Sequence, residues 1–154
     1  MSEHREFSCQ IEPMSIGDFD DVTRLWENTE GVGLNESDTR DALSLYLDRN
    51  PGMSLVARHD REIIATVLCG HDGRRGFLYH LAVAEAYRKK GLGRKLVEMC
   101  LEKLTQAGIL RCNILVFANN SDGEAFWLRE GWTKRSELQL LQKALGNSKS
   151  SCPC

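Results

Sequence analysis

The fold of this chain is decided by the stretch Leu81-Ala-Val-Ala-Glu-Ala-Tyr-Arg-Lys-Lys-Gly-Leu-Gly-Arg-Lys-Leu96. An apolar strand, predicted over 77–83, runs through a basic turn into a helix predicted over 91–107. The N-terminus of a helix presents unpaired N–H groups and a partial positive charge. Glycine lets a ligand approach such amides closely, and Gly91 and Gly93 stand at this point. We therefore expect the turn to bind a diphosphate group.

Basic side chains gather around this turn although the chain as a whole is slightly acidic, with a formal net charge of −2. Between residues 74 and 95 the only acidic residue is Glu85, against seven Lys and Arg residues. The overall balance argues against a general nucleic-acid binder. A local basic cluster in such a chain indicates a single anionic ligand, although a solvated helix start would also explain it.

Two familiar phosphate-binding loops do not fit the turn. A dinucleotide fingerprint needs a glycine or alanine three residues after Gly93, where this chain has Leu96. A P-loop needs Gly-Lys-Ser/Thr, whereas the glycines here are followed by Leu92 and Arg94. What remains is Arg-x-x-Gly-x-Gly over residues 88–93, directly after a strand.

The rest of the chain reads as one α/β domain around a central sheet, over residues 1–145. Further strands are predicted over 7–12, 53–58, 63–69, 110–117 and 136–141, with a hairpin at 59–61. Helices are predicted between a Ser15 cap and Gly31, over 37–48, and from a capping box at Ser121 to Gly131. Residues 146–154, which include Cys152 and Cys154, read as a flexible tail. No apolar run is long enough to cross a membrane, and we expect a cytoplasmic protein.

The sequence resembles the GNAT superfamily of N-acetyltransferases, in its single-domain bacterial form. The signature of that superfamily, Gln/Arg-x-x-Gly-x-Gly/Ala between the central strand and a helix, is satisfied at residues 88–93. A second motif, Asn-x-x-Ala-x-x-Phe/Leu-Tyr-x-x-x-Gly-Phe, matches residues 120–132 with three departures: Gly123, Trp127 and Trp132. The resemblance extends from about Phe7 to Leu145.

The resemblance implies a mixed, mostly antiparallel sheet that splays open at the cofactor site and is flanked by helices. It also implies transfer of an acetyl group from acetyl-CoA to a primary amine, on a small molecule or a protein, without a metal. Nucleic acid and membrane are not expected partners, and a homodimer is the assembly that the superfamily often forms. The residues expected to bind the cofactor are Leu81, Ala82, Val83, Arg88, Lys89, Lys90, Gly91, Leu92, Gly93, Arg94, Asn120, Phe126 and Trp127. For Asn120, capping of the last helix is the alternative role.

The motifs leave the catalytic groups open, because Trp127 replaces the tyrosine that usually protonates the leaving thiolate, and an indole N–H is not a practical acid. His80 is the expected base and Tyr79 the expected acid. In a regular strand these neighbours face opposite sides, so both reach the substrate only if a bulge intervenes. His80 as a packed core histidine stays an alternative, as does a non-catalytic acyl-CoA sensor of the same fold.

Two further groups of polar residues are candidates for the acceptor side. His71 and Asp72 would form a pair beside the amine, unless they are only the polar residues that a turn needs. The acids between the first two helices, Glu27, Glu30 and Glu36, would suit a cationic amine, and surface solvation explains them equally well.

Overall fold

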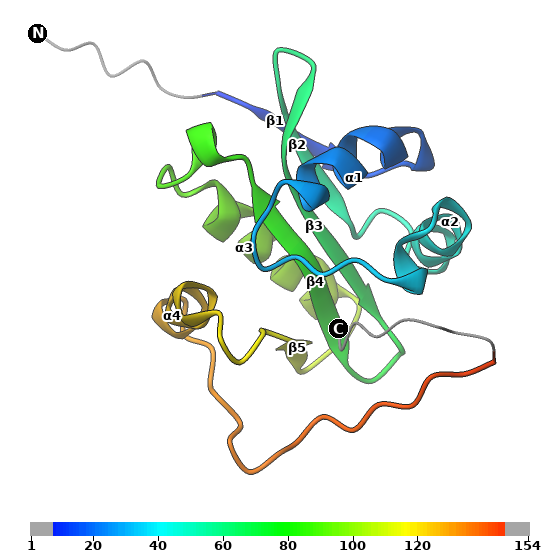
Figure 1. Ribbon diagram of the computed structural model, residues 1–154, viewed down its shortest axis with the longest axis vertical. Coiled ribbons are helices and arrows are strands. Elements are labelled where there is room, and N and C mark those ends of the chain that lie inside the picture. The colour runs from blue at the N-terminus through cyan, green and yellow to red at the C-terminus, as the bar shows by residue number, and fades with distance from the viewer. Residues whose placement is uncertain (1–7, 147–154) are drawn as a thin grey trace, which may run out of the picture.

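A five-stranded sheet forms the middle of the molecule, in the order β1-β2-β3-β4-β5 (Figure 1). The structure is a computed structural model, and it describes residues 8–146. Neighbouring strands are antiparallel except β4 and β5, which are parallel. The strands are β1 (Gln10–Pro13), β2 (Leu55–His59), β3 (Glu62–His71), β4 (Gly76–Val83) and β5 (Cys112–Ile114). The α-helices are α1 (Phe19–Glu27), α2 (Arg40–Arg49), α3 (Leu92–Gln106) and α4 (Ser121–Arg129).

Helices cover both faces of the sheet, because the central strands are apolar on both sides. On one face, α1 and α2 bury Trp26 and Leu43 against side chains of β2, β3 and β4. On the other face, α3 buries the stripe that recurs every four residues, Leu92, Leu96, Cys100 and Leu104. Figure 1 shows α3 behind the sheet and the other two helices in front of it. The predicted α/β sheet is therefore confirmed.

Strand β4 contains an irregularity that decides where its side chains point. Leu68 of β3 pairs with Tyr79, whereas Thr66 pairs with Ala82. Two residues of β4, His80 and Leu81, therefore lie opposite a single residue of β3, which is a β-bulge. His80 adopts a left-handed backbone conformation at this point, with φ of +50°.

The sheet opens between β4 and β5. Their pairing runs from Gly76 opposite Cys112 to Leu78 opposite Ile114 and then stops. Beyond it, the edge of 81–83 that faces away from β3 has no strand beside it within residues 8–146. This is the splay that the resemblance implied.

Several predicted elements agree with the structure to within a few residues, and others need correction. The hairpin at 59–61 is confirmed, and the Ser15 capping box precedes a short 3-10 helix, η1 (Ile16–Asp18). The helix predicted over 37–48 is divided into η2 (Glu36–Asp38), another 3-10 helix, and α2, because Thr39 is extended and caps α2 through Ala42 N–H. The strand predicted over 110–117 is only three residues long. The cap of α4 is Asn120 rather than Ser121.

The strand predicted over 136–141 was wrong. This segment begins in a turn that Leu138 N–H closes on the carbonyl of Arg135, and the side chains of Leu138 and Leu140 are exposed. An alternating pattern produces a strand only where a neighbouring strand supplies hydrogen bonds. In Figure 1 the segment instead passes beyond β5 as an extended strap. Phe7, with which the first strand was predicted to begin, and tail residues 147–154 lie outside the described residues.

Candidate active site

The turn between β4 and α3 has the backbone geometry of an anion cradle. Lys89 and Gly91 are both left-handed, with φ of +61° and +77°, so the chain reverses sharply there. Gly91 is the N-cap of α3, and its carbonyl accepts the first intrahelical bond from Lys95 N–H at 3.1 Å. The N–H groups of 92–94 therefore have no acceptor within the helix. They form a cluster of donors at the positive end of the helix dipole.

Gly93 marks the point at which the strand end, the helix start and α4 converge. A Cβ atom at Gly93 would lie 3.7 Å from Val83, 3.8 Å from Phe126 and 3.9 Å from Leu81. All three residues are among those predicted from the sequence to bind the cofactor. Because Gly93 has no Cβ, a space of about one methyl group is left between these three side chains.

Two of the basic side chains near the cradle are directed toward protein groups. Arg88 Nε donates to the carbonyl of Val83 at 2.9 Å, which ties the turn back to the end of β4. Arg94 Nε lies 3.1 Å from Glu98 and 3.4 Å from Glu130, so it bridges α3 and the end of α4. Lys89 and Lys90 are exposed on the same turn. Ala82 and Leu92 are buried, so only their backbone groups can face a ligand.

The bulge in β4 brings Tyr79 and His80 to the same face of the sheet. Tyr79 packs edge-on against Tyr46 of α2, with ring centroids 6.4 Å apart, and stacks on Phe77. His80 packs edge-on against Trp26 of α1, with centroids 4.7 Å apart. A regular strand would have separated these neighbours, and the bulge that the prediction required is present.

The protonation of Tyr79 is shaped by its surroundings. Partial burial raises the pKa of its phenol above the usual value, and the neighbouring Cys112 acts in the same direction. The phenol is therefore neutral at physiological pH and can donate a hydrogen bond.

His80 has a partner that sequence reasoning missed. Its Nε2 lies 2.7 Å from Asp38 Oδ1, and the two side chains are only 14% and 9% exposed. Asp38 is 42 residues away in sequence, at the end of η2. The one local signal was the spacing of Asn35 and Asp38, which is that of a cap and is common at helix starts.

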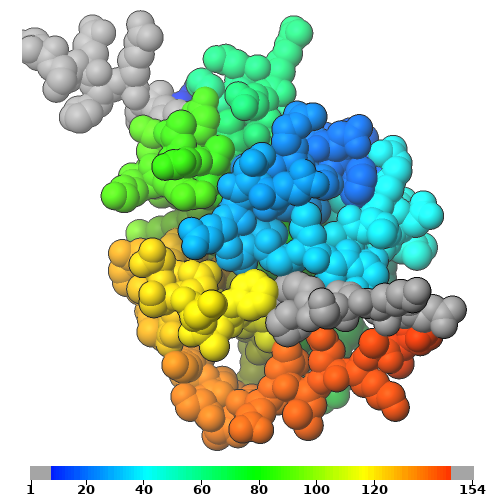
Figure 2. Space-filling view, in the orientation of Figure 1, coloured from blue at the N-terminus to red at the C-terminus, as the bar shows by residue number. Residues whose placement is uncertain are grey.

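The first turn of α4 lies against the loop that follows α1. Asn120 Oδ1 accepts a hydrogen bond from Gly123 N–H at 3.0 Å, which is the capping role. The amide of the same side chain lies so close to Gly31 that a Cβ there would come within 2.8 Å of Nδ2. In Figure 2 the blue surface of this loop adjoins the yellow start of α4. The loop and α4 thus meet across the opening of the sheet.

The two aromatic residues of the second motif have different environments. Phe126 is half-buried and lies beside Gly93. Trp127 is only 7% exposed and packs edge-on against Phe126 and Trp132 as part of the core under α3. The position of the usual tyrosine is therefore occupied by a core side chain.

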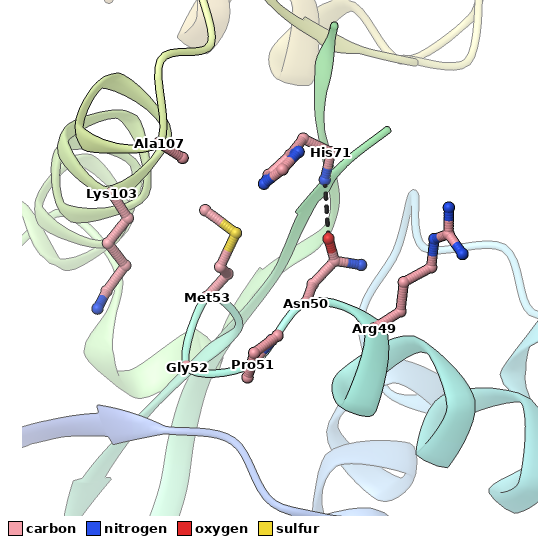
Figure 3. A pocket seen from close by; sticks show the side chains of 8 residues that line it. All are labelled: Arg49, Asn50, Pro51, Gly52, Met53, His71, Lys103 and Ala107. Carbon is pink, nitrogen blue, oxygen red and sulfur yellow. Dashed lines mark hydrogen bonds between the residues drawn. The ribbon is translucent and has the colours of Figure 1, made fainter. Parts of the chain in front are cut away.

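The other polar candidates do not gather at this site. His71 is the last residue of β3 and Asp72 follows it in the β3–β4 turn, at the opposite end of β4 from Val83. Asp72 caps that turn through Arg74 N–H and Arg75 N–H, which holds the pKa of its carboxyl below the usual value. Figure 3 shows the side chain of His71 beside a cavity of about 340 Å³ that Lys103 also lines. Glu27 at the end of α1, Glu30 in the loop that follows and Glu36 in η2 are all exposed.

Neither a metal centre nor a membrane span is found in the part of the chain that the structure describes. Residues 8–146 contain no group of three or more His, Cys, Asp or Glu side chains arranged to hold a metal ion. None of their helices combines the length and the apolar character needed to cross a bilayer.

Comparison with known proteins agrees with this geometry. Residues 19–132 match the model of the acetyltransferase (GNAT) family. An acetyltransferase of Sodalis glossinidius is 27% identical over 128 residues, which cover 83% of this chain and 89% of that protein. An acetyltransferase of Yersinia pestis is 32% identical over 103 residues, covering 67% and 72%. A PaiA N-acetyltransferase from Thermoplasma acidophilum, solved with coenzyme A, superposes with a TM-score of 0.68 at 21% identity, covering 80% and 88%.

Proposed function

The chain belongs to the acetyltransferase (GNAT) family and is an acyltransferase, and on this premise we propose that it acetylates primary amines by direct attack in a ternary complex. The family uses acetyl-CoA, which supplies the acetyl group as a reactive thioester. The observation that carries the proposal is the convergence at Gly93 of Leu81, Val83 and Phe126. It supports a single site in which the start of α3, the end of β4 and α4 lie together.

The cofactor would be held mainly by backbone groups. The N–H groups of 92–94 would bind the diphosphate, with Lys89 and Lys90 adding charge, whereas Arg88 N–H is already donated to the carbonyl of Glu85. The free edge of 81–83 would bind the pantetheine arm as an added strand. Backbone binding of this kind explains why the strand can be plainly apolar and why buried Ala82 and Leu92 still belong to the site. Phe126 would close the side facing α4, with Asn120 at the far end.

His80 would take the proton of the attacking amine. An alkyl ammonium has a pKa of about 10.4, so a base or a water relay must remove a proton before the nitrogen attacks. His80 lies at the bulge, where the strand edge that would hold the thioester begins. A backbone N–H of 81–83 would stabilise the negative charge that develops on the carbonyl oxygen. The new C–N bond forms as the C–S bond breaks.

The departing thiolate would be protonated without the usual tyrosine. A free thiol has a pKa of about 8.5, so a phenol whose pKa lies above its usual value of about 10 is a poor proton source for it. Tyr79 would therefore donate a hydrogen bond to the leaving sulfur. The proton itself would come from the His80 imidazolium or from water. Trp127, buried in the core, has no part in this step.

The acceptor is a primary amine on a small molecule or on a protein. Carboxylates of the early loop would attract its positive charge, and Asp38 is the one that lies beside His80. A cytoplasmic location and a homodimer also remain predictions.

A thiol-release assay over a panel of amines tests the enzymatic function. Sustained turnover with any acceptor is the expected result and removes the second candidate, a non-catalytic acyl-CoA sensor. That candidate is favoured only by the replacement of the motif tyrosine by a buried tryptophan. Binding of acetyl-CoA without turnover of any amine would favour it.

His80→Ala tests the base. We expect it to lower kcat by about 10²-fold or more while the Kd for acetyl-CoA changes little, because the imidazole contacts Asp38 and Trp26 and has no assigned role in holding the cofactor. His71→Ala is the matched control, since His71 lies at the opposite end of β4. An unchanged pH–rate profile in His80→Ala would exclude His80 as the titrating base.

A further inference from the structure

The contact between Asp38 and His80 joins η2 to β4, the strand that carries the proposed base. We infer that Asp38 is a positioning residue for His80, which fixes the ring proton on Nε2 and leaves Nδ1 to accept the amine proton. This inference rests on the proposed function of His80 as the base. The 2.7 Å separation and the burial of both side chains carry it.

Both carboxylate oxygens of Asp38 are engaged. Oδ1 faces His80 Nε2, and Oδ2 accepts a hydrogen bond from Asn35 N–H at 3.0 Å. An ionised carboxylate can only accept hydrogen bonds, so the imidazole nitrogen that faces it must carry a proton. In the neutral ring the other nitrogen is then the acceptor. The carboxylate would also stabilise the imidazolium that forms when Nδ1 is protonated.

The imidazole is also held from other directions. Its ring packs against the edge of Trp26. The indole Nε1 of that residue donates to Thr66 Oγ1 at 2.8 Å, and Thr66 Oγ1 donates to the carbonyl of His80 at 2.9 Å. The carbonyl of His80 is thus held by a buried hydrogen-bond chain, and its ring lies between Trp26 and Asp38.

The same contact connects the segment between α1 and α2 to strand β4. Asp38 ends η2, which follows the loop that meets α4 at Gly31 and Asn120. A carboxylate of η2, which follows this loop, therefore contacts the proposed base on β4. The exposed glutamates act on that base only weakly, because solvent screens their charge.

Asp38→Asn is the direct test. Asn35 N–H still requires an acceptor, so the amide oxygen turns to it and the NH2 group faces His80. Nε2 must then accept, which moves the ring proton to Nδ1 and removes the base. We expect kcat to fall by about 10²-fold with little change in KM for acetyl-CoA. Asp38→Glu, which keeps the carboxylate, should retain more activity than Asp38→Asn.

Asp18→Asn is the matched control for the loss of a carboxylate that caps a 3-10 helix. Asp18 accepts from Ser15 N–H at 2.9 Å and ends η1, just as Asp38 ends η2, but it pairs with Arg58 instead of a histidine. It should lower stability without changing kcat. If Asp38→Asn retains the kcat of the wild type, or if Asp18→Asn loses as much kcat as Asp38→Asn, the inference is overturned.

A spectroscopic measurement separates this inference from the proposed function. Long-range ¹H–¹⁵N spectra of histidine-labelled wild-type protein report which ring nitrogen carries the proton. We expect the proton on Nε2 of His80 in the wild type and on Nδ1 in Asp38→Asn. A wild-type proton on Nδ1 would overturn the inference, even if Asp38→Asn does not fold. A wild type that turns over no amine would refute the proposed function alone, since the ring tautomer is read without activity.

Discussion

Arg88 donates a hydrogen bond from Nε to the carbonyl oxygen of Val83, five positions earlier in the chain at the end of β4. Arg88, the arginine of the signature, thus fixes the backbone of the turn by a hydrogen bond, here called the clamp, and also carries a positive charge. It closes the turn beside the backbone N–H groups of 92–94, which have no acceptor within the helix. The bond links the two halves of the predicted cofactor site.

Arg88→Ala should weaken coenzyme A binding without unfolding the protein. Loss of a hydrogen bond from a charged donor costs about 1.5 kcal/mol, which corresponds to about a tenfold higher Kd. Isothermal titration calorimetry with coenzyme A measures it. Arg74→Ala is the control, because Arg74 is an exposed member of the same basic cluster in the β3–β4 turn. Equal losses of affinity in both variants would mean that charge alone, and not the clamp, matters.

Gly91→Val should abolish the rise in melting temperature that saturating acetyl-CoA produces. That rise reflects about 2.7 kcal/mol when the ligand is at a hundred times its Kd. Gly91 has φ of +77°, which a β-branched residue adopts only with strain of about 1–3 kcal/mol. The variant should therefore also be less stable without ligand.

Gly108→Val separates strain from binding. Gly108 follows the other end of α3 with φ of +81°. A Cβ added there would meet no atom of residues 8–146 within 4 Å beyond its immediate chain neighbours, and the same holds at Gly91. The variant should lose similar stability and keep the full response to acetyl-CoA. A full response in Gly91→Val would refute the cradle.

Thr66→Val should destabilise the fold by about 1–3 kcal/mol, because Trp26 Nε1 loses its acceptor and the His80 carbonyl loses a donor in a buried region. Urea unfolding measures the loss. Thr105→Val is the control, since Thr105 is exposed on α3 and should change stability by less than about 0.5 kcal/mol. If the two variants are equally stable, the buried chain does not hold the bulge.

Tyr46→Phe should stabilise the protein by about 1 kcal/mol, because the Tyr46 hydroxyl is buried without a hydrogen-bond partner among residues 8–146. Burial also raises the pKa of this phenol above its usual value, with Cys69 and Tyr79 acting in the same direction. Because the pKa is higher in the folded state, the unfolded chain loses this proton first, so the Tyr46 phenol lowers the free energy of unfolding only as the pH rises above about 10. The variant should therefore resist alkaline unfolding better, as urea titrations at pH 7 and above pH 10 would reveal. Lower stability at pH 7 would contradict this.

Much of the site could be predicted from short-range pattern. The glycines and the basic turn between a strand and a helix indicate an anion cradle, because helix-end amides and left-handed turns are local properties of a few residues. The motif at 120–132 likewise indicated α4 and its contact with the cofactor side. The pattern failed at 136–141, where alternation of leucines was present but no strand lay beside it within the described residues.

The sequence by itself determined the α/β class and the loss of the usual tyrosine at Trp127, and it predicted an anion cradle at 88–94, since each depends on residue type and local spacing. Only the tertiary structure decided that Tyr79 and His80 share a face and that Asp38 contacts His80. The bulge depends on pairing with β3, and the Asp38 contact joins residues 42 apart in sequence. Neither the register of one strand on another nor the closure of a distant loop is encoded in local periodicity, because both depend on the summed packing of the whole domain.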